Sequence, residues 1–309
     1  MVYFFYGDNT YTAKEQISKL VERYHNSMGS DFGLSRFESD ADIDSVVTSL
    51  TSLPMLADNS LVIIEHPSKN KAMTSAIEAN IDRVPDDTVV VIYDPEVDKR
   101  SKWYKFIKAA AKTQEFATKS EGALVTWLQK YAKDQDLKID SQLTRKLIDR
   151  VGPDQWRLSS EVDKLASLGD INEEHIDALV LPSPRHTIFE LIDVLSSGDI
   201  TRGLSYYDDL KQQNIHDLEI LTMLGWQLRN LIVVAHSDNS PDHQVAKEHG
   251  INPYVVNKSR KVLRNTSIKH LENVYKQVIE ADYSIKTGQS SDSSSVLERV
   301  MFNIAKVTK

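Results

Sequence analysis

The chain has 309 residues, of which 40% are hydrophobic and 27% charged, as in soluble globular proteins of two or three domains. It contains no cysteine, which excludes disulfides, thiolate metal sites and cysteine nucleophiles. Its formal net charge of -8 argues against a surface that binds nucleic acid over its whole extent, although a local basic patch is compatible with it. Because no run approaches the roughly 20 apolar residues of a membrane span, and the N-terminus has no secretory pattern, we expect a cytoplasmic protein.

Short apolar runs alternate with helical segments over residues 1–121, which predicts an α/β domain. The predicted strands are Tyr3–Tyr6, Leu34–Phe37, Leu61–Ile64, Val89–Tyr93 and a weaker run at Glu115–Thr118. The predicted helices are Ala13–Tyr24, Ile43–Leu53, Lys71–Ile81 and Ser101–Lys112. Because the third and fourth strands are continuous and β-branched, like strands buried on both faces, we expect a doubly wound, mostly parallel sheet.

The loop after the first strand lacks the pattern of a phosphate-binding loop. That pattern is G-x-x-x-x-G-K-[ST], because backbone N–H groups wrap the phosphates and a hydroxyl holds magnesium. Counted from Gly7, Thr12 stands at the second glycine and Ala13 at the lysine. Lys14 comes one place late, and Glu15 adds a carboxylate. We therefore expect no nucleotide or other cofactor here, and a function in binding rather than catalysis.

A second loop places large apolar residues where polar ones are usual. A predicted helix ends before Pro54, since proline disfavours helix for the residue preceding it. Met55 and Leu56 follow, and Asp58 and Asn59 come after them. Two interpretations stay open: the pair forms an exposed hydrophobic contact for a partner, or it folds back and covers the end of the sheet.

The segment Asp94–Lys108 follows the most hydrophobic predicted strand, at the carboxyl end where α/β sheets place their sites. Its basic residues are Lys99, Arg100, Lys102, Lys105 and Lys108, and Trp103, Tyr104 and Phe106 lie among them. Such a mixture suits stacking on bases and contact with phosphates, so Lys99, Arg100, Lys102 and Lys105 are candidates for contact with DNA or a partner. The spacing favours a plainer alternative, an amphipathic helix that buries Trp103, Phe106 and Ile107.

No other segment predicts catalysis or a metal site. Asp40, Asp42 and Asp44 alternate as in a calcium loop, but Ser45 and Thr51 stand where that loop needs glycine and glutamate. An acidic entry to the next helix is the better interpretation. The nine histidines lack the spacing of a zinc hydrolase, and no nucleophile motif is present.

Strand patterns disappear after residue 121, and two all-α domains are expected at 122–182 and 183–309, joined at Pro182-Ser183-Pro184. The first contains Ala123–Lys133, Ser141–Val151, Trp156–Leu168 and Asn172–Leu179. The second contains Thr187–Ser196, Ile200–Gln212, Asp217–His236, Pro241–His249, Pro253–Val262, Ser267–Ile285 and Ser295–Val307. A flexible loop is expected at Gly288–Ser295.

Several segments, in order and spacing, resemble the family of delta subunits of the bacterial DNA polymerase III clamp loader. They are FYGDNTY, SLPMLADNSLVIIE, DPEVDKRSKWYKFIK, LSSEVDKLA, IFELIDVLSSGD and IKTG. The resemblance covers nearly the whole chain. It implies a degenerate AAA+ domain at 1–121 that does not hydrolyse ATP, a helical lid domain at 122–182 and a helical collar domain at 183–309.

The resemblance also implies a role and a site. The family binds and opens the ring-shaped sliding clamp in DNA replication, together with gamma/tau-type and delta prime subunits and primer-template DNA. Its clamp contact, normally Leu-Phe in a pattern like S-L-P-L-F, corresponds here to Met55-Leu56 with Leu53 before it. The leucine in place of an aromatic, and the Asp58-Asn59 pair in place of basic residues, depart from the family pattern.

Two functions of other classes remain as alternatives. One is a nucleotide-dependent enzyme with an unusual phosphate site, in which Asp94 at the end of a strand takes the place of a magnesium ligand. The other is a freestanding DNA-binding protein that uses the basic helix at Lys99–Lys108, against which the acidic net charge argues.

Overall fold

The computed structural model describes residues 1–29, 31–53, 59–169, 171–237, 240–264, 266–290 and 292–305. Contacts divide the chain into two compact units, Met1–Thr118 and Lys119–Lys309. We call them the α/β unit and the helical unit, and describe each by itself.

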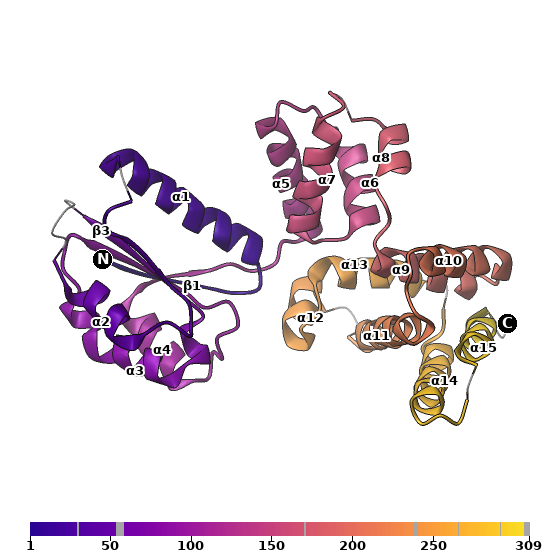
Figure 1. Ribbon diagram of the computed structural model, residues 1–309. Helices are drawn as coiled ribbons and strands as arrows, with labels where there is room; N and C mark the ends of the chain where they lie inside the picture. The colour runs from indigo at the N-terminus through magenta and orange to yellow at the C-terminus, as the bar shows by residue number, and fades with distance from the viewer. Residues whose placement is uncertain are drawn as a thin grey trace. The chain divides into compact units, whose positions relative to one another are not determined.

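The α/β unit is built on a parallel sheet of five strands (Figure 1). The strands are β1 Val2–Tyr6, β2 Leu34–Phe37, β3 Ser60–Glu65, β4 Thr88–Tyr93 and β5 Lys112–Glu115. Their order is β2-β3-β4-β1-β5, so β1 lies between β4 and the edge strand β5. Since parallel strands point the same way, the loops after β1, β3 and β4 meet at one edge of the sheet.

Helices cover both faces of this sheet, which confirms the doubly wound prediction (Figure 1). Helix α1 (Thr10–Met28) lies on one face, and α2 (Ile43–Thr51), α3 (Lys71–Asn80) and α4 (Lys102–Ala110) lie on the other; two short 3-10 turns occupy Pro67–Lys69 and Ile81–Arg83. Side chains alternate along each strand, so Phe5 packs on the α1 side and Phe4 on the opposite side. Burial on both faces explains why the central strands are continuously apolar.

Several boundaries in this unit differ from the sequence prediction: α1 extends over Thr10–Met28 rather than Ala13–Tyr24, and α4 ends at Ala110 rather than Lys112. The fifth strand occupies Lys112–Glu115 rather than 115–118, and all four of its residues are exposed. Helix α2 ends at Thr51 rather than Leu53, because Ser52 already has an extended backbone with ψ 142. The acidic segment before α2 is a helix entry as predicted, since the Asp42 carboxylate accepts a hydrogen bond from the Ser45 backbone N–H.

The helical unit contains no strand in the part of it that the structure describes. Its helices are α5 Glu121–Asp134, α6 Ser141–Val151, α7 Gln155–Ala166, α8 Glu173–Leu179, α9 Pro184–Ser196, α10 Ile200–Gln212, α11 Asp217–Ala235, α12 Asp242–His249, α13 Pro253–Val262, α14 Ile268–Lys286 and α15 Ser293–Ala305. Asn172 caps α8 through the His175 backbone N–H, as its position predicts. Helix α15 begins at Ser293, inside the segment predicted to be a loop.

One continuous hydrophobic cluster runs through the helical unit, from Leu124 in α5 to Ile304 in α15. The separation of lid and collar domains at residue 182 therefore stays a prediction. Helix α11 is the single described helix long and apolar enough to cross a membrane by length and composition, which the sequence expectation overlooked. It contributes buried residues such as Leu224 and Leu228 to the core of this unit, and a core helix passes the same test.

Candidate functional site

The loop after β1 is closed by the chain's own backbone. Gly7 has φ +113, and a Cβ added there would lie 2.5 Å from the carbonyl oxygen of Phe116. The Asn9 backbone N–H donates to the same oxygen at 2.9 Å, and the Asn9 side chain caps α1 by accepting from the Thr12 N–H at 3.0 Å. The segment after β5 therefore occupies the approach to this loop.

Lys14, the basic residue nearest the position of a phosphate-binding lysine, already has a partner. Its ammonium forms an ion pair with Glu65 at the end of β3, and it lies 5.2 Å from the centre of the Tyr93 ring. Glu65 is buried, so the lysine compensates a carboxylate that otherwise lacks water. The Lys14 ammonium is therefore already paired with Glu65 of the same unit.

Asp94, the alternative magnesium ligand, has a structural role. Its side chain is fully buried and accepts hydrogen bonds from the Ser68 backbone N–H at 3.1 Å, the Ser68 hydroxyl at 2.9 Å and the Trp103 indole N–H at 3.3 Å. Burial raises the pKa of this carboxyl, and the hydrogen bonds from Ser68 and Trp103 act in the opposite direction. Its contacts join the end of β4 to the 3-10 turn Pro67–Lys69 and to α4, so its carboxylate oxygens are already used within the fold.

The predicted hydrophobic contact is described in part. Leu53 follows α2, and 68% of its surface is exposed, which is high for a large apolar residue. Met55 and Leu56 lie outside the described residues, so both interpretations of that pair stay open.

The basic helix α4 packs as the plainer interpretation predicts. Trp103 and Ile107 are buried in the core of the α/β unit and Phe106 packs against them. Two of the four candidate cations have partners: Lys99 pairs with Glu115 at 2.7 Å, and Arg100 with Asp98 at 3.2 Å.

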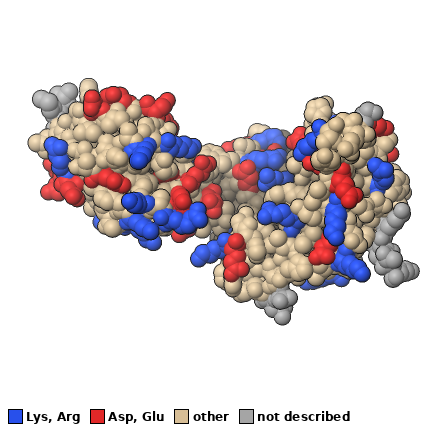
Figure 2. Space-filling model, turned by 90° about the horizontal axis from the view of Figure 1, so that it is seen from below, with Lys and Arg blue, Asp and Glu red and all other residues tan. Residues whose placement is uncertain are grey.

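Lys102 and Lys105 are exposed on the outer face of α4, and neither forms an ion pair with a described residue. On the face of the α/β unit shown in Figure 2, basic and acidic side chains are intermixed. A continuous basic surface is therefore not visible on that side.

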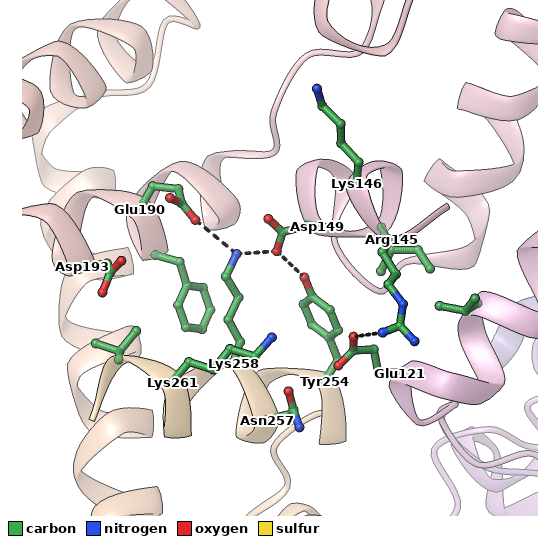
Figure 3. Close-up of a pocket in the computed structure, with 14 residues that line it drawn as sticks. Glu121, Arg145, Lys146, Asp149, Glu190, Asp193, Tyr254, Asn257, Lys258 and Lys261 are labelled. Atoms are coloured by element: carbon green, nitrogen blue, oxygen red, sulfur yellow. Dashed lines mark hydrogen bonds and ion pairs between the residues drawn. The ribbon is translucent and has the colours of Figure 1, made fainter. Parts of the chain in front are cut away.

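The helical unit holds a cavity of about 550 Å³ that the sequence did not predict (Figure 3). Helices α5, α6, α9 and α13 line it. At its centre the Lys258 ammonium donates to Asp149 at 2.8 Å and lies 3.4 Å from Glu190. It also lies 3.2 Å from Nδ1 of His186, and the Tyr254 hydroxyl donates to Asp149 at 2.9 Å.

Charges around the cavity shift several pKa values. Burial and the Lys258 charge lower the pKa of His186 to about 4, although Asp149 acts in the opposite direction. The charge of Lys258 and its hydrogen bond hold the pKa of Asp149 below its usual value, and outweigh the burial that raises it. Burial, with the nearby Asp149 charge, raises the pKa of Tyr254.

The sequence contains spacings that are compatible with this cluster, but they do not predict it specifically. His186 and Glu190 are four residues apart in α9, and Tyr254 and Lys258 are four apart in α13, so each pair shares a helix face. Their meeting with Asp149 of α6 depends on long-range packing. Donor atoms of Asp149, His186 and Glu190 lie within 4.8 Å of one another, as in a metal site, but the Lys258 ammonium already lies among them.

The geometry defines a class: a parallel α/β unit with a closed first loop, followed by a helical unit. Two family models match, DNA polymerase III, delta subunit, at residues 3–117, and DNA polymerase III delta subunit, C-terminal domain, at residues 185–304. The chain is 25% identical to DNA polymerase III subunit delta of Bacillus subtilis (strain 168), over 99% of this chain and 93% of that protein.

The fold resembles that of the Bacillus subtilis DNA clamp loader delta protein, with a TM-score of 0.72 and 24% identity, over 99% of this chain and 95% of that one. Since the two family models together cover most of the chain, it belongs to the family of DNA polymerase III delta subunits. The resemblance identified in the sequence is thereby confirmed, and the family gives the chain a clamp-loader role in DNA replication.

Proposed function

We propose that this chain binds and opens the ring-shaped sliding clamp through its α/β unit without hydrolysing ATP itself. The observation that carries the proposal is the exposure of Leu53, 68%, at the end of α2 and directly before the Pro54-Met55-Leu56 segment. An isolated exposed leucine needs no explanation. One that leads into two further large apolar residues, at the position of the family's clamp contact, fits a docking segment.

The energy of such a contact suits a reversible interaction. Burying two large apolar side chains contributes on the order of 3–6 kcal/mol before entropy losses. Binding of this chain shifts the equilibrium between the closed and the open clamp only to the extent that the chain binds the open clamp more tightly than the closed one. Binding that favours the open interface therefore opens the ring without any covalent step.

ATP binding in this proposal belongs to neighbouring subunits of gamma/tau type, with delta prime completing the loader. The commitment of Lys14 to Glu65, and of the Asn9 N–H to Phe116, supports this division of labour. Nucleotide binding by the neighbours would move the α/β unit and so expose the docking segment. The complex would act in the cytoplasm on primer-template DNA.

Assembly with the other subunits is assigned to the helices after residue 183. The longest described helices after residue 183 are α11 and α14, and α11 contributes much of its apolar surface to the core of the helical unit. Helix α14 keeps Ile279 and Tyr283 exposed, at 50% and 61%, four residues apart on one face. We therefore assign the assembly contact to the outer face of α14.

The test is the affinity of variants for the sliding clamp of the same organism. We expect Met55→Ala with Leu56→Ala to weaken binding at least ~100-fold, the equivalent of about 3 kcal/mol. Leu53→Ser should weaken it less, because one side chain is removed. Surface plasmon resonance with immobilised clamp measures both.

Leu181→Ser is the matched control, because Leu181 is a leucine of nearly equal exposure, 69%, in the helical unit. It should leave clamp affinity unchanged. Unchanged affinity in the double variant would remove this assignment of the site. Retained clamp affinity together with DNA binding that weakens steeply with salt would favour the second candidate, a DNA contact through the exposed Lys102 and Lys105.

A further inference from the structure

The Lys258 ammonium connects three helices of the helical unit. Lys258 lies on α13, and its ammonium lies 2.8 Å from the Asp149 carboxylate on α6 and 3.4 Å from the Glu190 carboxylate on α9 (Figure 3). It also lies 3.2 Å from Nδ1 of His186, on α9. Helix α6 belongs to the α5–α8 group before residue 182, whereas α9 and α13 belong to the α9–α15 group after it. One cation thus links the two groups of helices, beside the hydrophobic cluster that continues through both.

The contact is buried enough for its loss to matter. Only 15% of the Lys258 side chain is exposed, and its ammonium also lies 5.2 Å from the centre of the Phe189 ring. The side chains of Asp149 and Glu190 are 50% and 26% exposed, so the buried charge is that of Lys258, and it is costly there unless it is paired. The Tyr254 hydroxyl adds a second bond from α13 to Asp149.

The surroundings of this contact are hollow rather than closely packed. The cavity of about 550 Å³ separates α5 and α6 from α9 and α13 beside Lys258. Although the hydrophobic cluster continues through both groups, the part of their interface beside Lys258 is polar and open, and polar interfaces inside one chain permit movement more readily than closely packed apolar ones. The chain passes between the two groups once, near Ser183, whose backbone N–H donates to the Arg150 carbonyl at 2.9 Å.

We propose that Lys258 is a latch that fixes α5–α8 to α9–α15, and that releasing it lets the two groups of helices move about the connection near Ser183. The cavity gives α6 room to move towards α13 or away from it. This inference does not depend on how the chain contacts a clamp. The proposed joint lies near Ser183, just before the region 185–304 that the C-terminal family model matches. Neither of the two family models covers α5–α8 on its other side.

The test compares two lysines of the same helix. Lys258→Met removes the latch, and Lys261→Met is the control, because Lys261 lines the same cavity and forms no ion pair with a described residue. The chain has no cysteine, so Ser160→Cys in α7 and Asn273→Cys in α14, both exposed, supply a unique pair of spin labels. Double electron–electron resonance then measures the distance distribution between the groups.

We expect a narrow distribution in the parent chain and in Lys261→Met, and one about twice as wide in Lys258→Met, as for a hinge released from its contact. Asp149→Asn is the milder second variant, since an amide oxygen can still accept from Tyr254 while the charge on α6 is lost. It should give an intermediate width. If circular dichroism shows both variants folded and their distributions stay as narrow as the parent's, the latch is overturned; if Lys258→Met does not fold, Asp149→Asn alone decides.

Discussion

At the scale of the residue, His186 is a titratable group that the fold keeps neutral. Its ring is largely buried in α9, with the Lys258 ammonium 3.2 Å from Nδ1 and Asp149 3.9 Å from the same nitrogen. Burial and the lysine charge lower its pKa from 6.5 to about 4, against the pull of Asp149 and with a smaller contribution from Arg150. Protonation of this ring is therefore costly in the folded chain.

This shift predicts how stability depends on pH. Between pH 6.5 and about 4 the unfolded chain protonates this histidine and the folded chain does not, so the free energy of unfolding falls as the pH falls through that window. The loss of stability is at most about 3–4 kcal/mol, because each pKa unit corresponds to about 1.36 kcal/mol. His186→Asn should flatten this part of the curve measured by urea unfolding. His243→Asn, at an exposed position of α12, should leave the curve as it is, and an equal effect of both variants would contradict the prediction.

Single residues were predicted well where their role is local. The Asp42 and Asn172 caps each depend on a backbone N–H three residues further along the chain, so they can be predicted from the local sequence. Leu53 was included in the candidate contact through the family resemblance, as the residue that precedes Pro54-Met55-Leu56. His186 and Lys258 were not recognised, because their partners lie far along the chain.

At the scale of the element, close packing of two helices depends on one glycine. Gly203 in α10 has no Cβ, and an added one would lie 2.4 Å from Leu195 Cδ2 of α9. Alanine normally stabilises a helix interior relative to glycine by about 1 kcal/mol. At this position the overlap with Leu195 should outweigh that gain.

We expect Gly203→Ala to destabilise the helical unit by about 1–3 kcal/mol, as over-packing does. Gly122→Ala is the control, since nothing lies within 4 Å of an added Cβ in α5. It should stabilise the chain by up to about 1 kcal/mol. Urea unfolding measures both, and a stabilising effect of Gly203→Ala would show that α10 does not pack on α9 as described.

Element positions followed from the sequence where burial leaves a periodic pattern. Helices α10 and α13 have the predicted bounds because their apolar spacing and flanking caps agree. Strand β5 was placed three residues too late, because its four exposed residues, KTQE, carry no apolar pattern. Its identity as a strand comes from pairing with β1, which is a long-range contact.

At the scale of the whole molecule, the two units have separate cores. Two clusters lie inside Met1–Thr118, on the two faces of the sheet, and the third lies inside the helical unit. No cluster of described residues includes members of both units. Because each unit has its own hydrophobic core, we expect each to unfold as a separate cooperative block.

Calorimetry should show two transitions rather than one. Gly7→Ala should lower only the transition of the α/β unit, because the new Cβ meets Phe116 at 2.5 Å and the backbone has φ +113. Gly203→Ala should lower only the other transition. A single transition that moves with both variants would mean that the two units unfold together.

The sequence by itself determined the alternation of strands and helices, the parallel doubly wound class, the missing phosphate loop and the membership of a clamp-loader family. The first three follow from spacing within a few residues, where periodicity and motif positions are read along the chain, and the family membership follows from a resemblance of several segments over nearly its whole length. The tertiary structure alone decided the strand order, the edge strand β5, the pairing of Lys14 with Glu65 and the meeting of Asp149, His186 and Lys258. The reason is physical: these contacts join residues distant in sequence, and burial and charge pairing select them only once the helices and strands have packed.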